Sequence, residues 1–279
     1  MKKNLTVLIT GCSSGIGKSL AEKFHSEGHR VIATSRDKSK IGFLAEKGID
    51  TYSLDVNSSK SISDFSAEVK SKYSDLEILI NNAGYGQIGP AVEIPDEIWQ
   101  KQFKTNLFGP AALMRELVSV MVSRKNGMIV NVGSISGITP TPFSAAYCAT
   151  KAAMHAYSDV LRMELLPFGI KVITVQPGAI RSNFGNAADE SIKDAFAENS
   201  LYLKYAKQIH YRAEISQIGA TSAEKFADKL YCKLMKKNPP LVIRIGSKST
   251  FLPFLKRWIP DKLLDKILSR NFGLSGSGN

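Results

Sequence analysis

The sequence predicts an α/β fold in which a doubly wound parallel sheet carries helices on both faces. Short apolar runs rich in β-branched residues alternate along the chain with longer stretches whose apolar residues recur at helical spacing. A glycine-rich turn, residues 10–18, joins the first apolar run to the first helical stretch. Strands that alternate with helices form parallel sheets. A strand, a glycine turn and a helix in this order form the opening of a dinucleotide-binding unit.

Length and composition indicate one ordinary globular unit. The 279 residues are 43% hydrophobic and 22% charged, which is common in soluble proteins. No apolar run approaches the roughly 20 residues that cross a bilayer, and no repeat or low-complexity linker divides the chain. We therefore predict a single domain, 1–279, with a core at about 5–182, a helical insertion over the cleft at about 183–222, and a C-terminal part at about 223–279.

The N-terminus and the cysteines bear on the cellular compartment. Residues 1–4 are basic, but the apolar run at 5–10 is too short for the core of a signal peptide, and no cleavage-type site follows. Cys12, Cys148 and Cys232 lack metal-ligand spacing and form no even disulfide framework. The four histidines are scattered. We expect a cytoplasmic protein in a reducing compartment, without a metal site.

The first strand, residues 5–10, leads into three glycines with the spacing G-x-x-x-G-x-G. Glycines let the backbone turn sharply and approach a pyrophosphate, which then lies at the positive end of the following helix. Apolar residues at 20, 21 and 24 continue that helix. We assign the cofactor contacts of this turn to Gly11, Ser13, Ser14, Gly15, Ile16 and Gly17.

The end of the second strand, residues 30–34, indicates which dinucleotide binds. NAD sites place an acidic residue about 20 residues past the glycines, where it holds the ribose 2′-hydroxyl. That position holds Ser35 here, and Arg36 follows. Because a guanidinium suits a 2′-phosphate, we predict NADP(H) as the cofactor. The alternative is a surface arginine that pairs with Asp37.

The third strand supplies a candidate contact to the adenine. A helix at about 38–47 precedes this strand, which we place at residues 50–56, and a helix at 59–72 follows. Asp55 and Val56 lie at its carboxyl end, where ligands bind in such sheets. Asp55 is a candidate for the adenine edge, and a helix cap or a turn is the alternative role of its side chain.

The fourth strand, residues 76–80, ends in small residues and amides. Small side chains leave room for a nucleotide, and the amides can hold the neighbouring strand. We therefore assign Asn82, Ala83 and Gly84 to the cofactor site.

Helical spacing resumes at Pro95 and continues to about Lys125. Asn106 is a polar residue among apolar neighbours in this stretch. A buried asparagine needs hydrogen-bond partners, so Asn106 is either a structural bridge or part of a proton path.

A tyrosine and a lysine four residues apart, Tyr147 and Lys151, are candidates for proton transfer. This spacing places both side chains on one face of a helix, one turn apart. A nearby ammonium favours the phenolate and lowers the tyrosine pKa, which suits a general acid or base for an alcohol or ketone. Ser134 follows the strand at 128–133, and its hydroxyl could hold a substrate oxygen beside Tyr147. An exposed helix face is the alternative interpretation of the pair.

The rest of the chain completes the sheet and the cleft. The sixth strand lies at 171–175, and residues 183–222 are polar with helical spacing. A helix at 224–237, a short strand at 241–245 and a helix at about 261–270 follow. Three aromatic residues suggest an apolar pocket, with ordinary core packing as the alternative: Phe143, Phe184 and Phe196.

Positive charge gathers near the C-terminus. The formal net charge is +12, and residues 225–270 hold twelve Lys or Arg against three Asp. The same part contains the apolar run 251–260. A solvated basic face is one interpretation. Attraction to a membrane surface, an acyl carrier or a phosphorylated substrate is the other. No nucleic-acid module is visible, so we expect no nucleic-acid partner.

Together, these motifs resemble the short-chain dehydrogenase/reductase family in their order and spacing across about residues 5–182. The matching motifs are Thr10–Gly17, Asn81–Gly84, Asn106, Ser134, Tyr147 with Lys151, and Pro177–Gly178. The resemblance implies a single-domain Rossmann-like fold. Residues 31–36 and the basic C-terminus look like the branch that contains 17β-hydroxysteroid dehydrogenases, retinol dehydrogenases and acyl-dihydroxyacetone-phosphate reductases.

The resemblance also implies a reaction, in which NADPH delivers hydride to a carbonyl of a lipophilic substrate of steroid, retinoid or acyl type. Tyr147 would protonate the alkoxide, and Ser134 would hold its oxygen. Lys151 would lower the pKa of Tyr147 and bind the nicotinamide ribose. Asn106 would hold a water that links Lys151 to solvent. The nicotinamide pocket would be formed by Pro177, Gly178 and Ile180.

By the same resemblance we expect a homo-oligomer, a dimer or a tetramer, formed through the helices near 100–125 and 148–165. A function of another class is a non-catalytic NADP(H)-binding sensor or scaffold, in which the fold persists without turnover.

Overall fold

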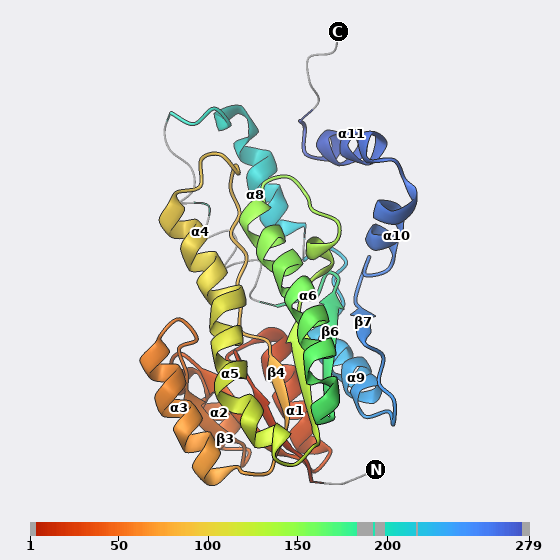
Figure 1. Cartoon of the computed structure of the whole chain (residues 1–279). Coiled ribbons are helices and arrows are strands. Elements are labelled where there is room, and N and C mark those ends of the chain that lie inside the picture. Colours follow the sequence, from red (N-terminus) through yellow and green to blue (C-terminus); the bar gives the residue numbers. More distant parts are fainter. Residues whose placement is uncertain (1–3, 183–191, 193–198, 216, 275–279) are drawn as a thin grey trace.

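Seven parallel strands form one sheet in the order β3-β2-β1-β4-β5-β6-β7 (Figure 1). The computed structural model describes residues 4–182, 192, 199–215 and 217–274. The sheet confirms the predicted doubly wound α/β fold and all seven predicted strands, with shifted ends. The strands are β1 (Thr6–Ile9), β2 (Arg30–Ser35), β3 (Asp50–Ser53), β4 (Leu76–Asn81), β5 (Gly127–Val132), β6 (Ile170–Pro177) and β7 (Val242–Ile245).

The order of the strands places the ligand-binding edge. Strand β1 pairs with β2 on one side and with β4 on the other. Strands β2 and β3 are therefore added to one side of β1, and β4 to β7 are added to the opposite side. Every residue of β1 and of β4 is buried, as expected where helices cover both faces. Ligands bind beyond the carboxyl ends of the strands at such a switch point. The glycine turn follows β1 at that edge.

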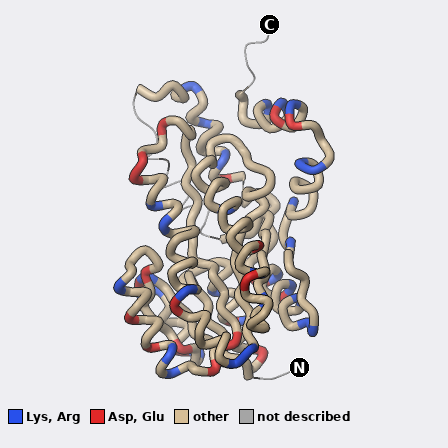
Figure 2. The backbone as a smooth tube through the Cα atoms, in the orientation of Figure 1, with Lys and Arg blue, Asp and Glu red and all other residues tan. Residues whose placement is uncertain are grey.

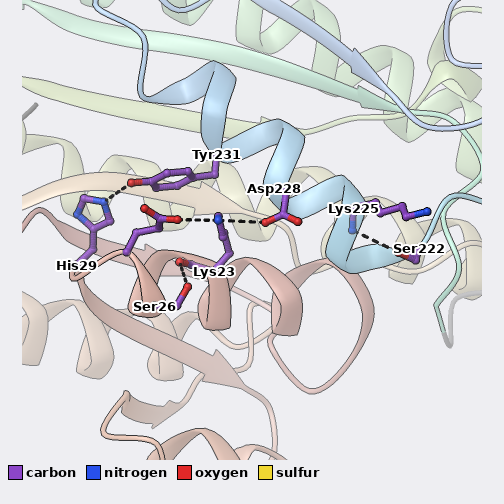
Figure 3. Close-up of polar contacts among 8 residues, drawn as sticks. Lys23, Ser26, His29, Ser222, Lys225, Asp228 and Tyr231 are labelled. Carbon is purple, nitrogen blue, oxygen red and sulfur yellow. Dashed lines mark hydrogen bonds and ion pairs between the residues drawn. The ribbon is translucent and has the colours of Figure 1, made fainter.

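One face of the sheet is covered by α1 (Gly15–Ser26) and α9 (Ala223–Leu234). Phe24 of α1 packs edge-on against Tyr231 of α9, with ring centroids 5.1 Å apart. Figure 3 shows the polar contacts around this pair: Lys23 meets Asp228 at 3.1 Å, and the Tyr231 hydroxyl lies 3.0 Å from Nε2 of His29. The C-terminal part of the chain thereby fixes the helix that follows the glycine turn.

The other face is covered by α3 (Ser59–Lys72), α5 (Gly109–Val122) and α6 (Ala145–Leu165). Apolar residues at helical spacing point from α3 and α5 to the sheet: Ile62, Phe65, Val69, Leu113, Leu117 and Met121. Helix α6 carries Tyr147 and Lys151 in its first two turns.

Some predicted boundaries are wrong. The single helix predicted from Pro95 to Lys125 is α4 (Asp96–Phe103), a π-helical turn (Lys104–Phe108) and α5. The helix predicted at 38–47 is a 3₁₀ turn (Lys38–Ile41) followed by the short α2 (Gly42–Ala45). The strand predicted at residues 50–56 is shorter in the structure, where β3 ends at Ser53 and Asp55 lies outside the sheet.

Of the segments after β6, α8 (Ala206–Glu214) lies above the carboxyl edge of the sheet, and the helices that follow β7 lie to one side (Figure 1). A 3₁₀ turn (Leu203–Tyr205) and α8 (Ala206–Glu214) belong to the predicted insertion. After β7 come α10 (Phe251–Trp258), a helix that we did not predict, and α11 (Asp261–Asn271). No helix in the described part of the chain is long and apolar enough to cross a membrane.

Candidate active site

The glycine turn between β1 and α1 is packed so closely that side chains are excluded. Gly11 has a φ of +73°, and a Cβ there would lie 2.8 Å from the Cα of Ala83. Gly15 has a φ of +54°, and its Cβ would lie 2.6 Å from the Cβ of Ser182. At Gly17 a Cβ would overlap the carbonyl oxygen of Gly11. The spacing of the three glycines therefore follows from the close contacts of the turn and of α1 with the segments that follow β1, β4 and β6.

The turn fits the phosphates of a dinucleotide. Helix α1 begins at Gly15, and the side chain of its N-cap residue Ser14 makes no capping hydrogen bond within the described chain. The first N–H groups of the helix, including that of Ile16, therefore remain available to an anion. A cavity of about 600 Å³ borders the turn. Two cations that the sequence analysis did not assign to the site, Lys18 and Arg181, line this cavity. Ser13, Ser14 and Gly15 line the same cavity.

Arg36 lies at the exposed end of β2, immediately after the buried Ser35. The alternative that it pairs with Asp37 is not seen. The Asp37 carboxylate accepts hydrogen bonds from the backbone N–H of Ser39 at 2.9 Å and from its hydroxyl at 2.6 Å. These bonds lower the pKa of Asp37. Arg36 has no ion-pair partner among the residues that the structure describes, so its guanidinium is available to a phosphate.

The ends of β1 and β4 are joined by the side chains of Thr10 and Asn82. The amide of Asn82 donates to the carbonyl oxygens of Thr10 and Gly11 at 2.9 and 3.1 Å. The Thr10 hydroxyl accepts from the backbone N–H groups of Asn82 and Ala83, both at 3.0 Å. The prediction that an amide here holds the neighbouring strand is confirmed. Gly84 is exposed at the same edge.

The structure gives Asp55 the turn role that was the alternative to an adenine contact. Its carboxylate accepts from the backbone N–H of Asn57 at 2.9 Å, and its own N–H donates to the Ser61 hydroxyl at 3.0 Å. Val56 is buried in the core beside the first residue of α5, Gly109. A contact of either residue with adenine stays a prediction.

Ser134 and Tyr147 meet at the centre of the carboxyl edge. Ser134 follows β5 and is 7% exposed, and Tyr147 in the first turn of α6 is 9% exposed. The Ser134 hydroxyl hydrogen-bonds to the phenol oxygen and accepts from the backbone N–H of Ser136 at 3.1 Å. Burial raises the pKa of Tyr147 to about 12, against the smaller opposing effect of the Ser134 hydrogen bond.

Desolvation of the phenolate exceeds the favourable interactions of Tyr147 in this structure, and Lys151 is not among the groups that offset it. The expectation that Lys151 lowers the pKa of Tyr147 stays a prediction. The Lys151 ammonium donates to the carbonyl oxygen of Val132 at 2.7 Å and lies 5.8 Å from the centre of the Tyr147 ring. Burial also lowers the pKa of Lys151 to about 8. The tyrosine therefore keeps its proton at neutral pH, as a proton donor must.

Asn106 lies in the π-helical turn between α4 and α5 and is 1% exposed. Its side-chain oxygen accepts from the N–H of Tyr85 at 3.2 Å, while its amide nitrogen donates to the Tyr85 carbonyl at 3.0 Å and to the Thr150 hydroxyl at 3.1 Å. Asn106 is thus a structural bridge between three segments of the site. Its place in a proton path stays a prediction.

The residues after β6 close the other side of the site. Pro177 is the buried last residue of that strand. Gly178 donates its N–H to the carbonyl of Ile245 at 2.9 Å, and a Cβ at Gly178 would overlap the carbonyl oxygen of Ser247. Ile180 is buried in the core. The predicted contact of these residues with nicotinamide is not tested by the geometry.

Phe143 has the core-packing role that was the alternative to an apolar pocket, because it lies in a separate cluster of buried side chains. Phe143 is 6% exposed and packs edge-on against Tyr202 and Phe272, with centroids 6.1 and 6.3 Å away. Phe184 and Phe196 lie outside the described residues. Phe143 has a φ of +61°, a strained conformation for a residue with a side chain. The ring contacts of Phe143 thereby join the loop before α6 to Tyr202 and Phe272.

Sequence reasoning missed two residues that touch this site. His155 lies one turn after Lys151, and its Nε2 accepts from the backbone N–H of Ser134 at 3.4 Å. Burial lowers the pKa of His155 to about 4, which keeps this acceptor neutral. The i+4 spacing from Lys151 was an available signal. Arg212 reaches the loop before α6 from α8, and nothing in its local sequence marks it.

The fold and the site define a dinucleotide-binding protein with a serine–tyrosine–lysine set suited to carbonyl or alcohol chemistry. The sequence matches the family described as short chain dehydrogenase over residues 5–193. The chain belongs to this family of oxidoreductases.

Individual relatives support the membership. The NADPH-dependent 1-acyldihydroxyacetone phosphate reductase of Schizosaccharomyces pombe is 37% identical over 84% of this chain and 80% of its own. The 3-ketodihydrosphingosine reductase of Bacteroides thetaiotaomicron is 32% identical over 94% and 96%. A solved short-chain dehydrogenase from Streptomyces avermitilis superposes with a TM-score of 0.81 at 30% identity, and covers 97% of this chain and 98% of that one.

Proposed function

We propose that this protein is an NADP(H)-dependent oxidoreductase that interconverts a ketone or aldehyde and an alcohol on a lipophilic substrate. The observation that carries the proposal is the buried hydrogen bond between Ser134 and Tyr147, with Lys151 one turn further along α6. These groups lie at the same sheet edge as the glycine turn.

The arrangement supports a division of roles among the side chains. When bound, NADPH supplies the hydride. The Ser134 hydroxyl donates to the substrate oxygen and stabilises the negative charge that develops there. Tyr147 gives its proton to that oxygen, and its raised pKa keeps the proton available at neutral pH. Lys151, held by the carbonyl of Val132, supplies positive charge behind the phenol.

Arg36 and the relatives support NADP(H) over NAD. The exposed guanidinium follows β2 where an acidic residue would hold a ribose hydroxyl. The relative from Schizosaccharomyces pombe is named as NADPH-dependent. An arginine at this position favours the phosphorylated cofactor, because its fork of donors matches phosphate oxygens.

A lipophilic substrate is supported by apolar side chains around the loop that precedes α6. A buried apolar cluster contains Phe143, Ile209 and Phe272 together with Ile88. Two relatives are named for reductions of an acyldihydroxyacetone phosphate and of a ketodihydrosphingosine, both of which contain a ketone. Among the steroid, retinoid and acyl classes, the first of these names favours the acyl class.

A substrate panel assayed in parallel with NADPH and NADH tests the function. The panel contains long-chain acyl-dihydroxyacetone phosphates, 3-ketosphinganine, steroid ketones, retinal and 3-oxoacyl thioesters. We expect NADPH oxidation with at least one ketone and a clear preference over NADH. Tight NADP(H) binding without turnover on any substrate would instead support the alternative, a non-catalytic sensor or scaffold.

The pKa of Lys151 predicts how the reduction rate depends on pH. Because the folded-state pKa, about 8, lies below the ordinary value of 10.5, the ammonium is lost as the pH rises through 8. We expect kcat/KM for reduction to be flat below pH 8 and to fall above it. Lys151→Arg keeps its charge, so its profile, although lower overall, should stay flat through this range. An identical fall of kcat/KM above pH 8 in both proteins would contradict the assignment of this fall to deprotonation of Lys151.

We further propose a homo-oligomer, either a dimer or a tetramer, formed through α5 and α6. Phe108 just before α5 and Val160 and Met163 on α6 are 59%, 48% and 63% exposed, an unusual number of apolar side chains on helices that otherwise pack on the sheet. Sedimentation equilibrium of the purified protein measures the state directly.

For localisation we propose a cytoplasmic protein that binds a membrane surface through α10 and α11. Phe251, Phe254 and Trp258 of α10 and Leu263 and Ile267 of α11 are exposed. Lys and Arg recur along the same two helices (Figure 2): Lys256, Arg257, Lys262, Lys266 and Arg270. Apolar side chains flanked by cations are typical of helices that lie in an anionic lipid interface.

Vesicle binding tests this surface. With vesicles of phosphatidylglycerol and phosphatidylcholine at low salt, the double variant Phe254→Ser and Trp258→Ser should bind at least about tenfold more weakly than the wild type, because two large apolar side chains are lost. The control replaces Leu201 and Leu203, which are also exposed and lie on the insertion, with serine. Equal binding of wild type and double variant, or binding to an acyl carrier protein alone, would overturn the membrane proposal.

A further inference from the structure

Arg212 is a buried cation on the substrate side of the site. It lies on α8, is 9% exposed, and stands in the sequence between Ile209 and Ala213, which both belong to the apolar cluster that contains Phe143. Arginine is almost never this deeply buried without a partner of opposite charge. Its position within the insertion therefore calls for an anionic group.

Among the residues that the structure describes, Arg212 has only neutral hydrogen-bond partners. The Nε of Arg212 donates to the Thr141 hydroxyl at 2.9 Å, and Nη2 donates to the Ser144 hydroxyl at 3.2 Å. A guanidinium has five N–H donors, so three lack an acceptor among the residues that the structure describes. No carboxylate forms an ion pair with Arg212 within that part of the chain. The two hydroxyls are neutral, so within the described residues the charge of the guanidinium is not compensated.

The contacts of Arg212 bring it close to Tyr147. Ser144, its second partner, directly precedes α6 and stands three residues before Tyr147. The Arg212 cation opposes the effect of burial on the pKa of Tyr147, so the two groups lie within electrostatic reach. Burial lowers the pKa of Arg212 itself, yet an arginine stays charged at any physiological pH.

We propose that Arg212 binds an anionic group of the substrate, a phosphate or a carboxylate, and so selects ketones that carry one. This inference rests on the proposed carbonyl reduction and specifies its substrate class as an anionic amphiphile. The apolar cluster holds the hydrocarbon part, and the free N–H groups of Arg212 hold the anion beside the carbonyl that faces Tyr147. A planar guanidinium with parallel donors matches both oxyanions.

Three matched ketones separate the possible ligands. They are 1-hexadecanoyl-dihydroxyacetone phosphate, its unphosphorylated parent, and the hemisuccinate ester of that parent, which replaces the phosphate with a carboxylate. We expect the wild type to prefer one or both anionic ketones. Arg212→Met should lower the ratio of kcat/KM between that anionic ketone and the neutral one by about 10- to 100-fold, the range for a lost charge-assisted hydrogen bond. Arg212→Lys should retain part of the preference.

The control variant addresses a merely structural role for Arg212, in which it only anchors α8 to the loop. Thr141→Val removes the 2.9 Å anchor but keeps the cation. Its ratio between anionic and neutral ketones should stay within about twofold of the wild type, because the charge remains. If Thr141→Val lowers this ratio as much as Arg212→Met does, the anchor explains the effect and the inference is overturned.

Failure of this inference can be distinguished from failure of the proposed reaction. If Arg212→Met has the same ratio of kcat/KM between anionic and neutral ketones as the wild type, the proposed carbonyl reduction is supported and the inference about Arg212 fails. If no ketone is reduced, calorimetric titration with decyl phosphate in the presence of NADP⁺ decides. A loss of affinity of at least about tenfold in Arg212→Met supports the anion site, and equal affinity in both proteins overturns it.

Discussion

Replacing Tyr147 with phenylalanine is expected to lower kcat for ketone reduction by about 1,000-fold, within the range for loss of a general acid. Phenylalanine fills nearly the same volume, so the packing of α6 remains. The substitution removes the proton donor and the hydrogen bond to Ser134. The measurement is NADPH oxidation at saturating concentrations of the best ketone in the panel.

Tyr157→Phe is the matched control for this variant. Tyr157 lies on the same helix, three turns further on, and packs with the core on the opposite face of the sheet from α1. Its loss should leave kcat within about twofold, as for a substitution far from the chemistry. A rate that is unchanged in Tyr147→Phe would show that another group delivers the proton.

Replacing Arg36 with aspartate is expected to reverse the cofactor preference. The guanidinium can form charge-assisted hydrogen bonds with a 2′-phosphate, and a carboxylate would repel it and instead accept from a ribose hydroxyl. We expect kcat/KM for NADPH to fall by about 100-fold and that for NADH to rise. Initial rates at varied concentrations of each cofactor measure both changes.

Lys40→Asp serves as the control for Arg36→Asp. Lys40 is exposed four residues later, in the 3₁₀ turn that follows β2. The same change in net charge at Lys40 should leave the preference for NADPH over NADH intact, because salt screens the interaction between distant charges that are exposed to solvent. If kcat/KM for NADPH falls to the same extent in both variants, long-range charge explains the effect, and a local phosphate contact does not. Equal use of the two cofactors by the wild type would remove the basis for assigning Arg36.

The sheet and the main site motifs were predictable because each depends on local sequence. A strand buried on both faces must be apolar along its whole length, as in β1 and β4. The glycines at 11, 15 and 17 are fixed by positive φ angles or by backbone contact. Tyr147 and Lys151 follow helical spacing. In each case the physical constraint acts within a few residues.

Other features could not be predicted because they arise from tertiary contacts. The π-helical turn at Lys104–Phe108 shows no local sequence signal, yet it is the segment from which Asn106 bridges to Tyr85 and Thr150. The pKa of Tyr147 depends on how completely the fold removes water, which spacing alone does not show. Arg212 is 65 residues from Tyr147 in the sequence, and only the fold of the insertion brings it to the site.

The fate of the nicotinamide hydrogen gives the most direct measurement of the proposed reaction. The wild-type protein is incubated in separate reactions with NADPH deuterated at the 4R or the 4S position, with 1-hexadecanoyl-dihydroxyacetone phosphate as the ketone. Mass spectrometry then locates the label in the alcohol product. We predict deuterium on the carbinol carbon from one of the two forms and hydrogen from the other. An alcohol without deuterium from either form, or no alcohol from any ketone of the panel, would contradict hydride transfer at this site.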